Sequence, residues 1–226
     1  MNISLLDVIG PVMIGPSSSH TAGATRLAKV ARLIVGQPFH RVSFGLGGSF
    51  ASTYKGHFTD YALVAGALGM NPDDEQIEYS FKIAHQKQIA YDFYPAELES
   101  NYENVVRITF YLLDGNTRTI EGASLGGGRI LITNIFGNPC EFTASCPTLI
   151  IQQQDVKGVI SKISTILAAH KINIAMMRVN RSQRGDTAFC TIECDDAIPL
   201  SVKDEVSNIE QVISVVVVNL DVTVHM

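Results

Sequence analysis

A histidine and four hydroxyl side chains gather immediately before an apolar run of helical spacing at residues 24–35. They are Ser17, Ser18, Ser19, His20 and Thr21. The free N–H groups and positive dipole end of a helix start attract anions, to which hydroxyls add hydrogen bonds. Histidine is the side chain whose charge changes near neutral pH. The stretch therefore predicts a site for a carboxylate or phosphate, with His20 as its catalytic residue.

The same stretch also has a purely structural interpretation. A helix start needs one side-chain oxygen to accept an unpaired backbone N–H, and Ser19 or Thr21 would serve. The other hydroxyls would then belong to a surface turn. The basic residues of the run would form its solvated face, namely Arg26, Lys29 and Arg32. Both interpretations remain open on this stretch alone.

A second polar cluster precedes residues 59–70, which also have a helical pattern. Its members within six residues are Lys55, His57, Thr59 and Asp60. Two histidine-bearing helix entrances in one small domain favour a ligand-binding function for both. The structural alternative is a surface His57 beside a capping Thr59 or Asp60.

The sequence lacks the motifs of a dinucleotide-binding site, of a serine hydrolase and of a cysteine metal site. Residues 45–47 read Gly-Leu-Gly, but Phe50 replaces the third glycine of a dinucleotide fingerprint. No Gly-x-Ser-x-Gly elbow of a hydrolase occurs. Cys190 and Cys194 fall on the apolar face of a strand, and the spacing of Cys140 and Cys146 fits neither a zinc ribbon nor a cluster loop. We therefore expect no metal ligands in this chain.

Composition limits the class of protein and its partners. The 226 residues carry 17 basic and 22 acidic side chains, a formal charge of -5, which leaves no basic surplus for nucleic acid. The first residues lack a basic leader region, and no apolar stretch is long enough to cross a membrane. We expect a soluble, cytoplasmic protein with no nucleic-acid or membrane partner.

The elements that must position these residues form two predicted domains, residues 1–146 and 147–226. The second has the order βαββαβ, with strands at 148–154, 172–179, 187–194 and 212–218 and helices at 158–170 and 202–209. That order predicts a ferredoxin-like fold. The first is an α/β sandwich with a mostly antiparallel sheet, from strands at 41–46, 106–112, 117–125 and 129–135 and helices at 24–35, 59–70 and 73–88. The fold class is α+β.

Three motifs give the chain a resemblance to a known family. They are IGPSSSHTAG at 14–23, TYKGH at 53–57 with Thr59-Asp60, and SLGGG at 124–128. The chain resembles the beta chain of the iron–sulfur-dependent L-serine dehydratase over nearly its whole length, and its C-terminal part resembles an ACT domain. Two departures are Phe58, where the family usually has glycine, and Tyr102-Glu103-Asn104 in place of His-Pro-Asn.

The resemblance implies a lyase that converts L-serine to aminoacrylate and then to pyruvate and ammonia. It implies a partner alpha chain whose cysteines hold a [4Fe–4S] cluster, which acts as the Lewis acid on the departing hydroxyl while a base takes the Cα proton. By similarity, residues 17–21 face the catalytic chain and help to position the carboxylate of serine. The residues implied in substrate binding besides His20 are Ser17, Ser18, Ser19, Thr21, Lys55, His57, Thr59 and Asp60.

The ACT resemblance implies a second binding region. Its first loop, residues 154–158, would hold an amino acid between paired domains, and Asn173 lies where such domains often place a ligand-binding side chain. The implied regulatory residues are Asp155, Lys157, Gly158 and Asn173, although Lys157 replaces a common proline. The alternative is an ACT domain that only dimerises, burying an apolar sheet face. Either way the chain is expected to be a homo-oligomer through this domain.

Two functions of different class stay open from the sequence. One is a catalytic subunit of the dehydratase, and the other is a stand-alone amino-acid-binding regulatory module. The intact Ser-Ser-Ser-His-Thr run favours the first, because a sensor has little need of a histidine among its carboxylate-binding hydroxyls.

Overall fold

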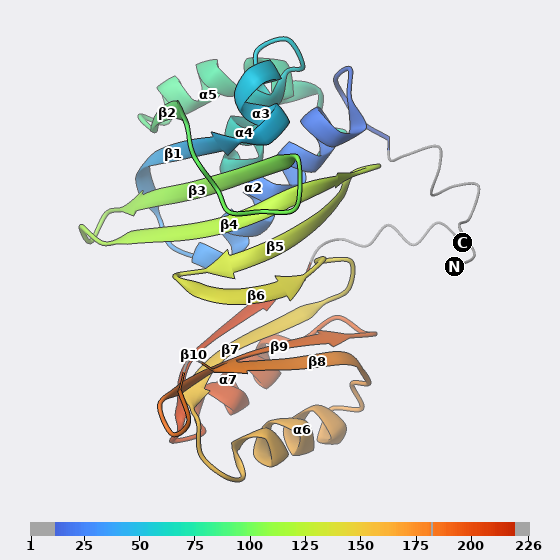
Figure 1. The fold of residues 1–226 in the computed structure, drawn as a ribbon. Coiled ribbons are helices and arrows are strands. Elements are labelled where there is room, and N and C mark those ends of the chain that lie inside the picture. Colours follow the sequence, from blue (N-terminus) through green and yellow to red (C-terminus); the bar gives the residue numbers. More distant parts are fainter. Residues whose placement is uncertain (1–11, 182, 220–226) are drawn as a thin grey trace. The chain divides into compact units, whose positions relative to one another are not determined.

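The computed structural model of the protein describes residues 12–181 and 183–219. They divide into two units at Gly137/Asn138. Each unit combines helices with a largely antiparallel sheet, so the predicted α+β class is confirmed (Figure 1). Within the described ranges, the helices are too short or too polar to span a bilayer.

The first unit contains one twisted sheet of strand order β2-β1-β3-β4-β5. The strands are β1 (Phe39–Gly47), β2 (Ala90–Pro95), β3 (Asn104–Leu112), β4 (Thr117–Gly126) and β5 (Arg129–Ile135). The turn that contains Asp114 and Gly115 joins β3 and β4, which pair antiparallel. β2 runs parallel to β1 and has no counterpart among the predicted elements. None of its six residues is buried, as suits an edge strand that ends in proline.

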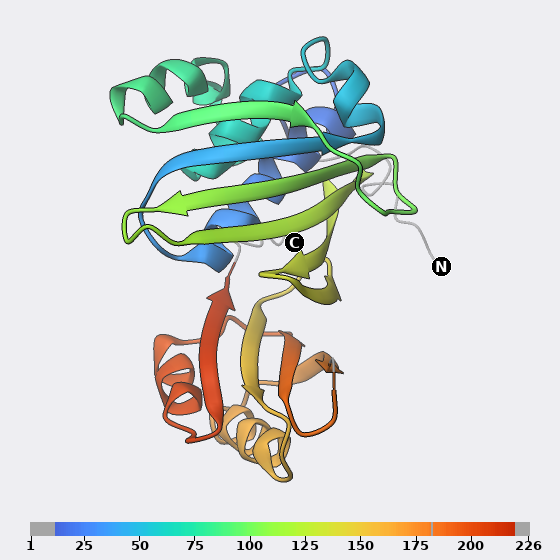
Figure 2. The ribbon, with the colours of Figure 1, turned by 60° about the vertical axis from the view of Figure 1, so that its left-hand side comes forward.

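Two helices cover one face of this sheet, α2 (Gly23–Val35) and α4 (Thr59–Leu68) (Figure 2). The apolar stripe of α2 packs on β3, β4 and β5. α4 is buried along its whole length and lies against α2. A Cβ on Gly66 would lie 2.1 Å from the carbonyl oxygen of Thr25, so only glycine permits this close helix contact.

Two further parts of the unit differ from the predicted pattern. α3 (Gly48–Thr53) is a short helix where no element was expected, and it starts at Gly48, with φ +55°. A Cβ there would meet the carbonyl oxygen of Glu103 at 2.1 Å. The helix expected over 73–88 is split into a 3₁₀ turn, η2 (Glu75–Tyr79), and α5 (Ser80–Gln86). Asp74 caps η2 by accepting the N–H of Gln76 at 2.8 Å.

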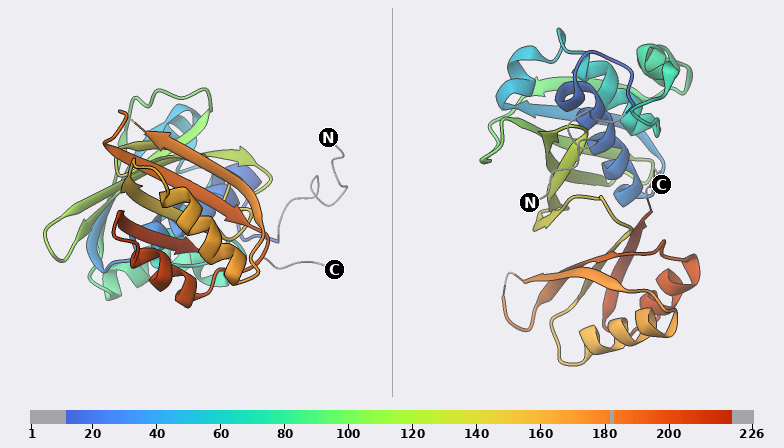
Figure 3. Two further views of the ribbon diagram at one scale, coloured as in Figure 1. Left: turned by 90° about the horizontal axis from the view of Figure 1, so that it is seen from below. Right: turned by 90° about the vertical axis from the view of Figure 1, so that its right-hand side faces the viewer.

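The second unit confirms the predicted βαββαβ order. Its elements are β7 (Thr148–Gln154), α6 (Val159–Ala169), β8 (Ile174–Arg181), β9 (Thr187–Cys194), α7 (Leu200–Ser207) and β10 (Val212–Val218). The antiparallel sheet has the order β10-β7-β9-β8. α6 and α7 lie side by side across one face of it (Figure 3). The predicted apolar face of β9 is confirmed, since Ala188, Cys190, Ile192 and Cys194 are all fully buried.

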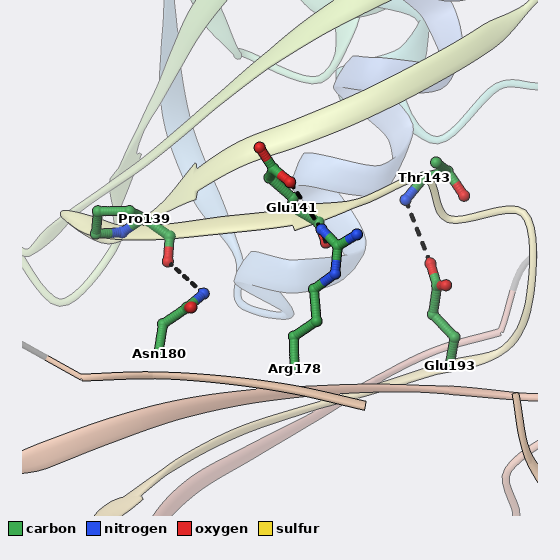
Figure 4. A network of polar contacts seen from close by, with 6 residues as sticks. All are labelled: Pro139, Glu141, Thr143, Arg178, Asn180 and Glu193. Atoms are coloured by element: carbon green, nitrogen blue, oxygen red, sulfur yellow. Dashed lines mark hydrogen bonds and ion pairs between the residues drawn. The ribbon is translucent and has the colours of Figure 1, made fainter. Parts of the chain in front are cut away.

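β6 (Asn138–Phe142) lies at the start of the second unit, before the predicted domain limit at residue 147, and was not among the predicted elements. Side chains of β8 and β9 bond to it and to the residue after it (Figure 4). Arg178 pairs with Glu141 at 2.8 Å, and the side-chain amide of Asn180 donates to the carbonyl of Pro139 at 3.1 Å. These bonds connect β6 with β8 and β9 within the second unit.

Candidate functional site

The serine run begins α2 with a single turn of π-helix, η1 (Ser18–Ala22). Ser17 is the N-cap, and its Oγ accepts the backbone N–H of His20 at 3.1 Å. The cap expected at Ser19 or Thr21 is therefore wrong, because the helical turn begins at Ser18, so the hydroxyl of the residue before it accepts the free N–H. π turns are rare and occur often at functional sites.

The predicted solvated basic face of α2 is also wrong. Arg26 is partly buried and donates to the carbonyl of Gly128 at 3.5 Å. Lys29 bonds to the side chain of Asn71, and Arg32 donates to the carbonyl of Ala67 at 3.1 Å. These side chains fasten α2 to neighbouring loops and helices.

The turn between β4 and β5 holds the serine run in place. The hydroxyl of Ser124 donates to the carbonyl of Ser19 at 2.8 Å, and Gly127 N–H donates to Ser18 Oγ at 3.3 Å. A Cβ on Gly23 would lie 2.0 Å from Ser124 Oγ, which explains glycine at the first residue of α2. Ser18 thus accepts from the turn and retains its own hydroxyl proton for another acceptor.

The imidazole of His20 is surrounded by hydroxyls on both sides. Its Nδ1 lies 3.1 Å from Ser19 Oγ, and its Nε2 lies 3.2 Å from Ser49 Oγ and 3.1 Å from Thr53 Oγ1. Phe50 packs edge-on against the ring, with the centroids 5.3 Å apart. Burial, and then the charge of nearby His57, lower the pKa of His20. The environment therefore favours the neutral imidazole at physiological pH.

Ser49 and Thr53 are site residues that the sequence analysis misses. They stand four positions apart on α3, so both lie on the face of that helix that meets His20. The signal that could have found them is Ser and Thr at i and i+4 after a paired glycine. It is weak because six residues are too few for a helical pattern.

The structure brings the two predicted clusters together. The rings of His20 and His57 have centroids 4.8 Å apart. The hydroxyl of Thr21 donates to the carbonyl of His57 at 3.1 Å, and His57 Nδ1 donates to the carbonyl of Thr53 at 3.3 Å. Thr21 is fully buried, so it ties the two segments to each other and does not face a ligand.

The remaining residues of the second cluster occupy different settings. Lys55 is exposed, with Nζ 5.7 Å from the ring centroid of Tyr54. Thr59 is fully buried, and its Oγ1 has no hydrogen-bond partner among the described residues. Asp60 accepts the N–H of Tyr61 at 3.0 Å, and burial raises the pKa of its carboxyl group. Among the described residues no side chain caps α4, so the capping interpretation of Thr59 and Asp60 is wrong.

Phe58 precedes α4 in the left-handed region, with φ +63°. Glycine adopts this conformation without the steric cost that a Cβ imposes. The ring of Phe58 stacks on that of Tyr61 at 4.5 Å, which offsets part of that cost. The departure from the usual family glycine therefore falls at a position where backbone geometry favours glycine.

A cavity of about 110 Å³ lies elsewhere in this unit. Its lining includes none of the predicted site residues. It is formed by Leu46, Ala51, Tyr54, Phe93, Tyr94 and Pro95. The convergence of polar groups on His20, and not this cavity, marks the candidate site.

In the second unit, the four predicted regulatory residues occupy two ends of the sheet. Asp155 follows the last residue of β7 and accepts from Arg181 at 2.9 Å and from Gly185 N–H at 3.0 Å. These bonds lower the pKa of its carboxyl group. Lys157 is exposed beside Gly158, the N-cap of α6.

Asn173 lies at the opposite end, because Ile174 next to it pairs with Cys194 beside the start of β7. Its side chain donates to Asp195 at 2.6 Å. One copy of the domain therefore does not bring Asn173 beside the other three regulatory residues.

The cysteines lie in settings that disfavour thiolate ligands. Burial raises the pKa of Cys140 and of Cys190 to about 12, and that of Cys194 to about 11. Cluster and zinc ligation require the thiolate. Within residues 12–181 and 183–219, His, Cys, Asp and Glu form no group of three that could hold a metal ion.

Comparisons with known proteins match both parts of the chain. The family model for the serine dehydratase beta chain matches residues 4–134, and the model for the ACT domain matches residues 148–211. The L-serine dehydratase beta chain of Peptoniphilus asaccharolyticus is 40% identical, over 92% of this chain and 94% of its own length. A probable L-serine dehydratase beta chain of Bacillus subtilis is 39% identical, over 94% of this chain and 96% of its own length.

A different enzyme shares a more distant similarity. The D-3-phosphoglycerate dehydrogenase of Bacillus subtilis is 25% identical over 87% of this chain, but that match covers only 37% of the relative. The similarity therefore concerns a part of that enzyme.

Proposed function

Because the chain belongs to the serine dehydratase beta chain family, we propose that it is the beta subunit of an L-serine dehydratase. The complex would convert L-serine to pyruvate and ammonia by loss of water and hydrolysis of the resulting aminoacrylate. The meeting of His20 with His57 among hydroxyls of two motifs carries this proposal. A neutral imidazole there can accept a proton, and the surrounding hydroxyls can bind a carboxylate.

The residues of this chain have distinct proposed roles. His20 is the catalytic residue, as a base or as the group that orients the substrate. Ser18 has a hydroxyl proton available for the serine carboxylate; exposed Lys55 supplies positive charge near it, and exposed His57 supplies a hydrogen-bonding ring. Ser17 and Ser19 act through their bonds to His20.

Three of the predicted substrate-binding residues are assigned a supporting part. Thr21, Thr59 and Asp60 are buried, with exposed fractions of 0%, 0% and 9%. Thr21 joins η1 to the loop before α4 through the His57 carbonyl. Their substitution should disturb the site through its geometry.

The [4Fe–4S] cluster implied by the family does not fit the cysteines described here, because three of them are buried and the described His, Cys, Asp and Glu residues form no group of three that could hold a metal ion. We assign the cluster to a partner alpha chain. This chain alone should therefore be colourless and inactive toward L-serine.

The second unit is proposed to bind an amino acid between paired copies. Asp155, Lys157 and Gly158 of one copy would face Asn173 of the other, since one copy holds them at opposite ends of its sheet. The domain limits proposed with this role are 1–146 and 147–226, in a cytoplasmic complex. A domain that only dimerises remains the alternative, as does a regulatory module without catalysis.

Co-expression with the candidate alpha chain tests the proposal. The purified complex should release pyruvate from L-serine under anaerobic conditions, and neither chain should do so alone. Amino-acid binding by this chain without complex formation would instead favour the regulatory module. A purified beta chain with stoichiometric iron that is lost on Cys140→Ser would contradict the assignment of the cluster to the alpha chain.

A further inference from the structure

Thr53 makes two close contacts with a single hydroxyl proton. Its Oγ1 lies 2.7 Å from the carbonyl oxygen of Ser49 and 3.1 Å from His20 Nε2. A carbonyl oxygen can only accept, so the proton of Thr53 is committed to Ser49. This bond to the carbonyl four residues earlier is a common one for helical threonine. The hydroxyl therefore presents only lone pairs to His20.

We infer that Thr53 holds neutral His20 as the Nε2–H tautomer and leaves Nδ1 as its acceptor nitrogen. A neutral imidazole has one N–H, and an oxygen that can only accept requires it at Nε2. Ser49 Oγ, 3.2 Å from the same nitrogen, can share this donor. Burial lowers the pKa of His20, which supports a neutral ring in the folded chain. Thr53 is in this sense a positioning residue.

The tautomer gives a direction to the hydroxyls of the serine run. Ser19 Oγ lies 3.1 Å from Nδ1 and must donate to it. Ser19 then accepts from Ser17, whose Oγ is 3.3 Å away and itself accepts the backbone N–H of His20. The hydroxyl protons thus point from Ser17 to Ser19 to His20. The acceptor nitrogen faces the serine run and not α3.

His57 carries its ring proton on the other nitrogen, Nδ1, and so serves as a comparison for His20 within the same chain. Its Nδ1 lies 3.3 Å from the carbonyl oxygen of Thr53, which can only accept, so His57 carries its proton on Nδ1. The same residue, Thr53, therefore directs one histidine through its hydroxyl and the other through its carbonyl.

This inference deepens the proposed function and rests on it only for its catalytic consequence. Proton uptake by His20 occurs at Nδ1, and the ring then donates at both nitrogens while Ser19 changes from donor to acceptor. A substrate group that exchanges a proton with His20 would approach from the side of Ser19.

Nuclear magnetic resonance of the full chain with ¹⁵N-labelled histidine rings tests the assignment. Protonated and unprotonated ring nitrogens give distinct long-range ¹H–¹⁵N patterns, and His20→Gln identifies the signals of His20. At mildly alkaline pH we expect the Nε2–H pattern for His20 and the Nδ1–H pattern for His57. An Nδ1–H pattern for His20 would overturn the inference.

Variants of α3 test the part played by Thr53. Thr53→Val removes the acceptor with little change of shape and should turn the single tautomer of His20 into a mixture, while Thr53→Ser should restore it. Ser52→Ala is the matched control, because Ser52 donates to the same Ser49 carbonyl at 3.1 Å without touching His20. An unchanged tautomer in Thr53→Val would refute the role of Thr53.

These experiments distinguish a wrong tautomer assignment from a wrong proposed function. If Thr53→Val does not fold, the spectra of the wild-type chain and of Thr53→Ser still decide the tautomer. If His20 is the Nε2–H tautomer but the reconstituted complex forms no pyruvate, the proposed function fails and the inference stands.

Discussion

The imidazole rings of His20 and His57 lie with centroids 4.8 Å apart and planes tilted by 37°. His20 belongs to η1, whereas His57 belongs to the loop before α4, and Thr53 on α3 contacts both rings. Two imidazolium charges at this separation repel each other, so protonation of one disfavours protonation of the other.

His20→Ala should abolish most activity of the reconstituted enzyme and leave its fold intact. Loss of a proton-transferring group costs roughly 100- to 10,000-fold in rate, whereas loss of this half-buried side chain should cost no more than about 1 kcal/mol in the free energy of unfolding. Pyruvate release and urea denaturation measure the two effects. His40→Ala, at an exposed position of β1, is the control. Turnover within a few fold of wild type would make His20 a bystander.

Ser18→Ala and Ser19→Ala should have different kinetic effects. Ser18 has a hydroxyl proton available for a carboxylate, so its loss should mainly raise KM. Ser19 bonds to His20 Nδ1, so its loss should mainly lower kcat. Steady-state kinetics of the complex separates the two parameters. Equal changes of KM with unchanged kcat in both variants would contradict the role given to Ser19.

His57→Gln should raise the pKa of His20 in the free chain. Burial and the charge of His57 lower that pKa from 6.5, so the native state binds fewer protons at His20 than the unfolded chain does. The contribution of neutral His20 to the free energy of unfolding is fully present above pH 6.5. It is lost as the pH falls through the lowered pKa of His20 in the folded chain. Without the charge of His57, the pKa of His20 lies closer to 6.5, so the loss of stability at acidic pH should be smaller. Titration of the His20 resonance measures the change in pKa, and His85→Gln on α5 is the control. An unchanged pKa of His20 in His57→Gln would show that the charges of the two histidines are not coupled.

Phe58→Gly should be more stable than Phe58→Ala. Both variants lose the stacking on Tyr61, but only glycine escapes the cost of a Cβ at φ +63°, about 1 kcal/mol. Urea denaturation of the full chain measures the difference. Position 82 in α5 is the control, with the opposite order expected. At this exposed helical position Lys82→Ala should have a free energy of unfolding about 1 kcal/mol higher than Lys82→Gly. Equal stability of the two variants at position 58 would argue against strain there.

Ile213→Lys should weaken self-association of the chain. β10 is an edge of the second sheet, and Ile213 is 55% exposed on it, so a charge should oppose pairing with a second copy. Light scattering at micromolar concentration should show a dimer or larger assembly for the wild type and a smaller species for the variant. Leu113→Lys, 69% exposed in the β3–β4 turn, is the control. A monomeric wild-type chain would contradict the proposed oligomer.

Local pattern alone specified much of the second unit. Strict alternation along residues 187–194 identified both the strand and its buried face, and helical spacing located α6 within one or two residues of its ends. These signals are strong because the apolar residues recur at the period of the element and so share one of its faces. The motif residues around His20 and His57 were likewise visible in the sequence, since an excess of polar groups at a helix start exceeds what capping requires.

Only the tertiary structure decided how those groups meet. Ser49 and Thr53 reach His20 because Gly48 lets α3 begin where the chain passes close to Glu103, a contact between distant segments. The cap is Ser17 because η1 begins at Ser18, in a segment that bonds to Ser124 and Gly127, over a hundred positions away. Sequence spacing fixes which side chains share a face of one element, but the packing between elements determines which atoms come within hydrogen-bond distance.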